Sequence, residues 1–103
     1  MARTRNIYGE VDSKTDLERI FKEIREDVEK AKRRPALTEL YRRAGYLVTL
    51  THAPSWETKF GREAASLRKE AESEFATTAR KVNQRARAIG TESDYDETWG
   101  KEK

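Results

Sequence analysis

The sequence contains no cysteine, one histidine, two prolines and five glycines among its 103 residues. The lack of cysteine excludes a disulfide framework, a thiolate zinc site, an iron–sulfur cluster and a cysteine nucleophile. One histidine leaves almost nothing for a Ser/His/Asp arrangement or a multi-histidine metal site. The glycines are scattered singly, so there is no glycine-rich phosphate loop. These absences favour a protein that is not an enzyme and that uses neither a cofactor nor a metal.

Long apolar runs are missing as well. No stretch approaches the roughly 20 consecutive apolar residues of a transmembrane helix, and residues 1–9 lack the apolar region of a signal peptide. We therefore expect a cytoplasmic protein that does not bind a membrane. Its length is that of one domain. Its net charge of +3, from 22 basic and 19 acidic residues, argues against disorder, although bulky aliphatic residues are few.

What the sequence does contain is helical periodicity, first over residues 16–34. Thr15-Asp-Leu-Glu18 has the form of a capping box, and Pro35 ends the pattern. Glu29 and Arg33 have the i, i+4 spacing of an ion pair on the outer face. The apolar residues recur at steps of three and four, as expected for one helical stripe: Leu17, Ile20, Phe21, Ile24, Val28 and Ala31.

A second helix is predicted over residues 36–52, with Pro35 at its start, where a missing amide hydrogen is harmless. Its apolar stripe consists of Leu37, Leu40, Tyr41, Ala44, Leu47 and Val48. Residues 46–51 are also short and β-branched enough to form a strand. We favour the helix because the stripe continues through this segment without a break in phase.

A third, long helix is predicted over residues 56–90, with Ser55 as its N-cap, Gly61 as a candidate kink and Gly90 as its C-terminal cap. Its stripe follows an eleven-residue rhythm, which indicates a nearly straight helix; the stripe consists of Phe60, Ala64, Leu67, Ala71, Phe75, Thr78, Val82, Ala86 and Ile89. The expected fold is all-α: a hairpin of the first two helices packed along the third. Residues 1–14 would form a partly ordered N-terminal arm, and residues 91–103 an acidic, aromatic tail.

The helix lengths suggest self-association. A helix of about 35 residues spans ~52 Å, whereas each of the first two spans only ~25–29 Å. The far half of the third helix, with Phe75, Val82 and Ile89, would then be exposed, which is unusual for a monomer. We therefore expect a homodimer formed through this helix.

Two charged segments are candidates for binding a partner. Residues 76–90 contain four cations and no acid, namely Arg80, Lys81, Arg85 and Arg87. These cations fit a helix C-terminus by their charge alone, or together with residues 30–34 they could bind nucleic acid. The tail has the opposite charge and contains Tyr95 and Trp99. Three alternatives follow: the tail is a frayed end, it folds back onto residues 80–87, or it docks on a basic groove of a partner protein.

The lone histidine lies in an aromatic joint between the second and third helices, where core packing or a small-molecule sensor site would fit. The residues expected to converge there are Tyr41, Tyr46, His52, Trp56 and Phe60. Taken together, the sequence favours a non-enzymatic interaction or assembly protein that acts as a homo-oligomer, with another protein as a further partner. Nucleic-acid binding is the alternative function, and a small-molecule sensor comes third.

Overall fold

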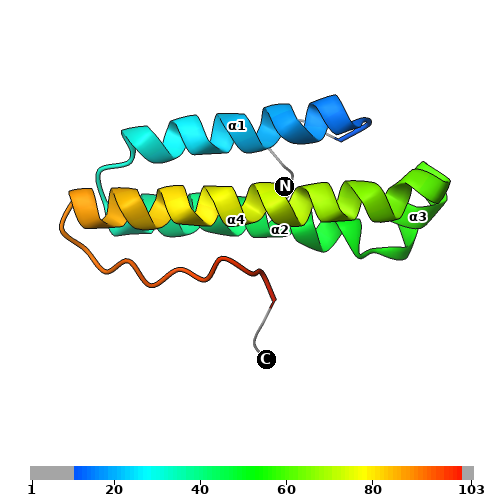
Figure 1. Ribbon diagram of the computed structural model, residues 1–103. Coiled ribbons are helices and arrows are strands. Elements are labelled where there is room, and N and C mark those ends of the chain that lie inside the picture. The colour runs from blue at the N-terminus through cyan, green and yellow to red at the C-terminus, as the bar shows by residue number, and fades with distance from the viewer. Residues whose placement is uncertain (1–10, 101–103) are drawn as a thin grey trace, which may run out of the picture.

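The computed structural model describes residues 11–100, and every regular element in that range is helical (Figure 1). The elements are α1 (Lys14–Lys30), α2 (Arg34–Thr51), α3 (Pro54–Phe60), the 3-10 turn η1 (Gly61–Glu63) and α4 (Ala64–Ala88). The all-α fold with a long third helical unit packed against the first two is confirmed. In Figure 1, α1 lies along one side of the α2–α4 pair. Most of the predicted N-terminal arm falls outside the described residues. Within them, no helix is long and apolar enough to cross a membrane.

The first helix begins and ends earlier than the sequence suggested. Its N-cap is Ser13, whose hydroxyl accepts a hydrogen bond from the Asp16 amide at 3.2 Å. The Asp16 carboxylate in turn accepts from the amide of Asp12 at 2.9 Å. The capping box predicted at Thr15 is therefore wrong, because a similar reciprocal arrangement forms two residues earlier. The helix ends at Lys30 rather than residue 34, since Ala31 is already extended and leads into the turn before α2.

The second helix continues through residues 46–51, so the strand alternative is wrong. Thr51, at its last position, is buried, and its hydroxyl donates to the carbonyl of Val48 at 2.6 Å. This bond lets a hydroxyl sit inside the core without an unsatisfied donor. Pro35 lies in the first turn, as expected, although the helix begins one residue before it.

The third helical unit runs from residue 54 to residue 88 but is interrupted at η1. Gly61 adopts φ +59°, a conformation that side-chain-bearing residues rarely take, and the chain changes direction there. The N-cap is Ala53 rather than the predicted Ser55, because Pro54 already occupies the first turn of α3. The Trp56 indole nitrogen donates to the Ala64 carbonyl at 3.2 Å and fastens the short α3 to the start of α4.

The core is filled within one chain, and this overturns the premise of the predicted dimer. Phe75 and Val82 are only 1% and 0% exposed, and Ile89 is partly buried against the core. α4 has 25 residues, about 37 Å, and Tyr95 and Trp99 pack against the same core. The expected exposed apolar half of the third helix is therefore absent, and with it the reason for a dimer. Dimerisation itself stays a prediction.

Candidate functional site

The most elaborate surface of the described chain is the one that holds the C-terminal segment, residues 91–100. Figure 1 shows this segment running back along the helices on the side away from α1. The chain reverses at Gly90, where φ is +81°, and the Thr91 amide donates to the Ala86 carbonyl at 2.9 Å. We call the side chains beneath it the tail-binding face; they are Arg34, Thr38, Tyr41, Gly45 and Thr49 of α2 and Phe75, Arg80, Asn83 and Arg87 of α4.

Asn83 holds the backbone of the C-terminal segment at Tyr95. Its amide nitrogen donates to the Tyr95 carbonyl at 2.9 Å, and its amide oxygen accepts from the Tyr95 amide at 3.0 Å. The Tyr95 side chain is 9% exposed, and its hydroxyl shares a hydrogen bond of 2.7 Å with Thr38. The Arg34 guanidinium lies 4.9 Å from the centre of its ring, at cation–π distance. Both the peptide backbone and the side chain of this residue are therefore recognised.

Trp99 forms the second anchor. Its indole ring lies directly on Gly45, so closely that a Cβ atom at this position would overlap the ring. Its indole nitrogen donates to the Thr49 hydroxyl at 2.9 Å, and its ring centre lies 5.5 Å from that of Tyr41 and 5.7 Å from that of Phe75. A glycine inside a helix costs about 1 kcal/mol relative to alanine. Here the missing side chain makes room for the indole.

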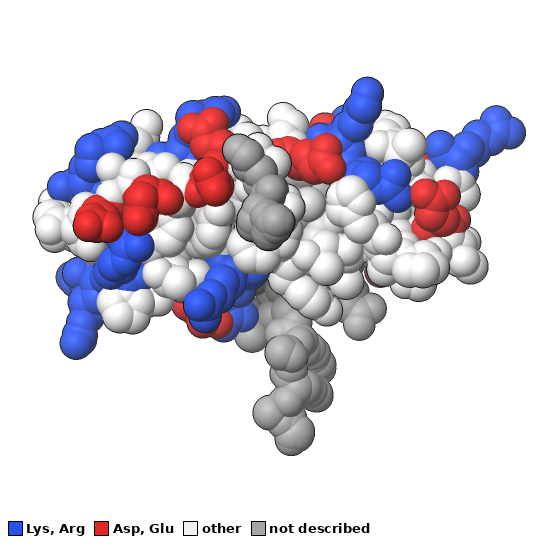
Figure 2. Space-filling model, turned by 90° about the horizontal axis from the view of Figure 1, so that it is seen from below, with Lys and Arg blue, Asp and Glu red and all other residues white. Residues whose placement is uncertain are grey.

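Ion pairs flank these anchors. Arg34 pairs with Asp94 at 3.0 Å, and Arg80 pairs with Glu97 at 3.0 Å. The hydrogen bond from Arg34 holds the pKa of the Asp94 carboxyl below its usual value. Figure 2, which views the molecule from below relative to Figure 1, shows acidic side chains between basic ones at one end of the bundle. Of the three alternatives for the tail, the structure therefore shows the folded-back one.

The four cations predicted as one binding stripe divide into two pairs with different partners. Arg80 and Arg87 face the C-terminal segment, and Arg87 donates to the Ser93 hydroxyl at 3.1 Å. Lys81 and Arg85 face the other way, towards α1 and the turn after it. Lys81 bonds to Glu29 and lowers the pKa of that carboxyl, so the ion pair expected between Glu29 and Arg33 is replaced by one between helices.

Sequence reasoning missed Asn83 and Gly45, the two residues that shape the tail-binding face. A signal was present for each of them. Gly45 lies inside the predicted second helix, four residues after Tyr41, and an isolated glycine inside a helix usually has a packing reason. Asn83 is a short amide inside a helix, within its last two turns, where it is an unfavourable residue unless its side chain has a partner. Neither signal indicates which distant segment the residue meets.

The predicted aromatic joint does not form as one cluster. Tyr41 packs against Phe75 and the C-terminal segment, whereas Trp56 and Phe60 pack against each other, with ring centres 4.4 Å apart. His52 lies on the surface with its side chain 56% exposed, and its Nε2 is 3.3 Å from the Glu72 carboxylate. This arrangement gives no support to a buried sensor site at the histidine.

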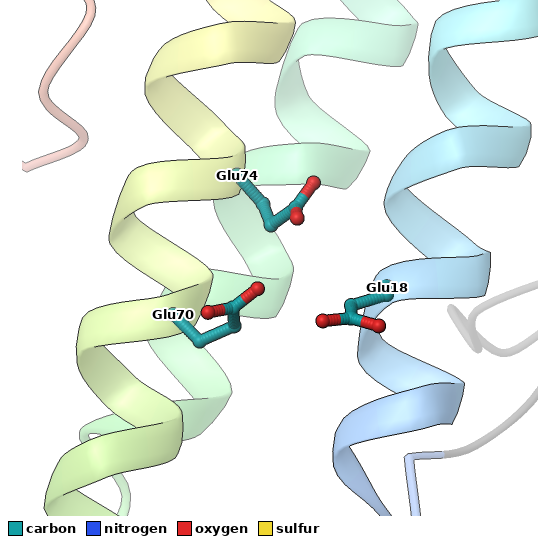
Figure 3. Close-up of side chains that lie close together, drawn as sticks. All are labelled: Glu18, Glu70 and Glu74. Atoms are coloured by element: carbon teal, nitrogen blue, oxygen red, sulfur yellow. The ribbon is translucent and has the colours of Figure 1, made fainter.

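Three carboxylates form a second cluster, between α1 and α4 (Figure 3). Oxygens of Glu18, Glu70 and Glu74 all lie within 4.8 Å of one another. Burial raises the pKa of Glu70, and the two neighbouring carboxylates raise it further. Calcium takes six to eight oxygen ligands, whereas this cluster offers three, and Glu74 already accepts a hydrogen bond of 2.8 Å from Arg25. The arrangement is that of a charged network joining two helices.

The chemistry available at the tail-binding face is that of binding. Its groups are guanidinium ions, hydroxyls, one amide and aromatic rings, which suit ion pairs, hydrogen bonds and ring packing. The C-terminal segment shows what such a surface accepts: an extended peptide with acids beside two aromatic anchors. Comparisons with protein-family models, curated proteins and solved structures give no match for this chain.

Proposed function

We propose that the protein is a non-enzymatic interaction protein whose tail-binding face binds an extended acidic segment of a partner protein. The observation that carries the proposal is the seating of residues 91–100, which are held by their backbone, their acids and their rings at once. In this proposal the C-terminal segment is an internal ligand. The partner's segment has the same chemistry, an aromatic pair four residues apart with carboxylates nearby, and takes its place.

The strength of the individual contacts supports displacement. The two ion pairs are exposed: the Asp94 and Glu97 side chains are 60% and 49% exposed. Such pairs contribute about 0–1 kcal/mol each. Ordering each backbone residue of the segment costs about 1–2 kcal/mol. Tyr95 is the one buried residue of the segment, and Trp99 is partly buried. The ordering cost therefore offsets part of the contact energy, and a partner with additional contacts can displace the segment.

Residue chemistry supports binding rather than catalysis. The chain has no cysteine, and its one histidine has an exposed side chain that pairs with Glu72 rather than with a group of the tail-binding face. A nucleophile activated by a neighbouring base needs the two side chains within hydrogen-bonding reach. At the tail-binding face the groups in reach of one another are arginines, hydroxyls, an amide and aromatic rings.

A labelled peptide of residues 91–99 tests the proposal on the full-length chain. In the Tyr95→Ala/Trp99→Ala variant the internal ligand is weakened, so we expect the peptide to bind at least about tenfold more tightly than to the wild type, because the tethered segment competes at a high effective concentration. Adding Gly45→Ala to that variant should abolish this gain, since the new methyl group meets the peptide's indole. A scrambled peptide is the control. Equal binding, or no binding, to all three proteins contradicts the proposal.

Self-association is a separate expectation with its own test. It rested on Phe75, Val82 and Ile89, of which the first two are buried within one chain. Light scattering after size exclusion measures the mass directly. A mass equal to the chain's 12.0 kDa, for folded protein at tens of micromolar, would contradict a homodimer.

A further inference from the structure

Two basic segments that are far apart in the sequence meet at one end of the bundle. The C-terminal end of α1, the turn into α2 and the C-terminal end of α4 lie together there (Figure 1). Arg85 of α4 fixes the junction, because its Nε donates to the carbonyl of Ala31 at 2.8 Å. We define the basic end as residues 29–34, 81–87 and 89–94. It contains seven cations and three carboxylates.

The basic end differs from the rest of the surface in how few of its cations form ion pairs with carboxylates. Elsewhere, most described cations have a carboxylate partner, as Arg25 has Glu74 and Arg68 has Glu57. At the basic end, four described cations have no carboxylate partner among the described residues: Lys30, Lys32, Arg33 and Arg87. The remaining cations without one are dispersed over other parts of the molecule: Lys22, Arg42, Arg62 and Lys69.

The N-terminus of α2 adds to the positive potential at the same place. This helix has 18 residues, and it has neither an acidic residue in its first turn nor a side-chain cap. Pro35 has no amide hydrogen, and the amides of Ala36 and Leu37 donate to the Arg33 carbonyl at 3.2 and 3.3 Å. The positive potential here therefore comes from the helix dipole rather than from a row of free amides. Arg33, at the N-cap position, and Lys32 before it are both exposed.

We propose that the basic end binds the phosphate backbone of nucleic acid without reading its sequence. Arginine guanidinium groups match phosphate oxygens in geometry as well as charge. Contacts confined to the backbone give affinity and orientation but no sequence selectivity. The basic end shares Arg34 and Arg87 with the tail-binding face, where they bond to Asp94 and Ser93. Lys32 and Arg33 belong to the basic end alone, because neither forms an ion pair or hydrogen bond with the C-terminal segment among the described residues.

Surface composition favours nucleic acid over an anionic membrane as the partner. A helix that lies on a membrane buries an apolar face in the headgroup region. Among the described residues, the exposed large hydrophobic side chain is Tyr46, in the middle of α2 rather than at the basic end. Charge without exposed apolar side chains suits a phosphate backbone in water.

The test is fluorescence anisotropy of a labelled 20-base-pair DNA duplex of arbitrary sequence, with the full-length chain at 50 and 200 mM salt. The Lys32→Glu/Arg33→Glu variant should bind at least about tenfold more weakly than the wild type at 50 mM salt. Arg62→Glu/Lys69→Glu changes the net charge equally at the opposite end and is the matched control, expected within about twofold of the wild type. Circular dichroism verifies that each variant is folded.

The salt dependence supplies an independent readout. Four phosphate contacts predict that binding weakens roughly a hundredfold between the two salt concentrations. The proposal is overturned if the duplex does not bind at 50 mM salt, if the two variants lose affinity equally, or if the affinity does not depend on salt. Tighter binding to vesicles of phosphatidylserine and phosphatidylcholine than to DNA would also overturn it, in favour of a membrane. None of these outcomes depends on whether the peptide of residues 91–99 binds.

Discussion

Gly45→Ala should change the stability of the protein in opposite directions, depending on whether Trp99 is present. In the wild type, the indole ring lies where the new methyl group would be, so the ring must leave its place on α2. Its departure removes one hydrogen bond to Thr49, worth about 1 kcal/mol, and part of the burial of an aromatic side chain. The chain gains about 1 kcal/mol from alanine in a helix interior.

The magnitude follows from these opposing contributions. Truncating a fully buried tryptophan costs about 3–5 kcal/mol, and a partly buried one correspondingly less, about 2–3 kcal/mol. Gly45→Ala should therefore destabilise the wild type by about 1–2 kcal/mol and stabilise the Trp99→Ala variant by up to about 1 kcal/mol. The coupling energy of the double-mutant cycle is then about 2–3 kcal/mol.

Urea unfolding followed by circular dichroism measures all four corners of this cycle. The chain has two tryptophans, so its NMR spectrum contains two indole signals, and only that of Trp99 should move towards the position of a solvated indole in the Gly45→Ala variant. If Gly45→Ala stabilises both backgrounds by the same amount, the indole does not cover Gly45, and the account of the tail-binding face is wrong.

Three further substitutions test other contacts. Glu70→Gln should raise the thermal midpoint at pH 7, because burial and nearby carboxylates raise the pKa of Glu70 and so disfavour its charged form in the fold. This gain in midpoint should fade as the pH falls through that pKa. Glu74→Gln, which weakens the hydrogen bond from Arg25, should instead lower the midpoint. Asn83→Ala should destabilise the protein by about 1–3 kcal/mol and accelerate amide exchange at Tyr95. Gln84→Ala, at the exposed neighbouring position, is the control and should have neither effect. Gly90→Ala forces an L-residue to φ +81° and should cost about 1 kcal/mol in urea unfolding; an unchanged midpoint would show that the turn into the C-terminal segment tolerates a side chain.

The helices and their buried faces could be predicted from the sequence because each depends on spacing within one segment. Leu17, Ile20 and Val28 repeat at helical intervals and are all fully buried on α1. The stripe of α4 is buried in the same way from Ala64 to Ala86. The helix ends were less predictable, since Ser13 and Thr15 offer alternative caps of nearly equal strength.

The tail-binding face could not be predicted, because its residues meet across 50 or more positions of chain in some pairs, such as Arg34 with Asp94 and Trp99 with Thr49. Periodicity within one helix carries no information about such partners. The same limit explains the wrong expectation of an exposed apolar half of α4. Counting helix lengths omitted the C-terminal segment, whose Tyr95 and Trp99 join the core on the side away from α1.

The net charge of +3 hides how the charges are distributed, and long-range pairing explains why. In the C-terminal segment, Asp94 and Glu97 form ion pairs with Arg34 and Arg80, on the flank of the α2–α4 pair. Glu29 forms an ion pair with Lys81, and both residues belong to the basic end. The acids near the basic end are thus engaged with cations of their own, which leaves Lys32 and Arg33 without a counterion in the described chain. A nearly balanced composition can therefore hold a strongly basic surface, because partner choice, rather than the sum of charges, sets the local potential.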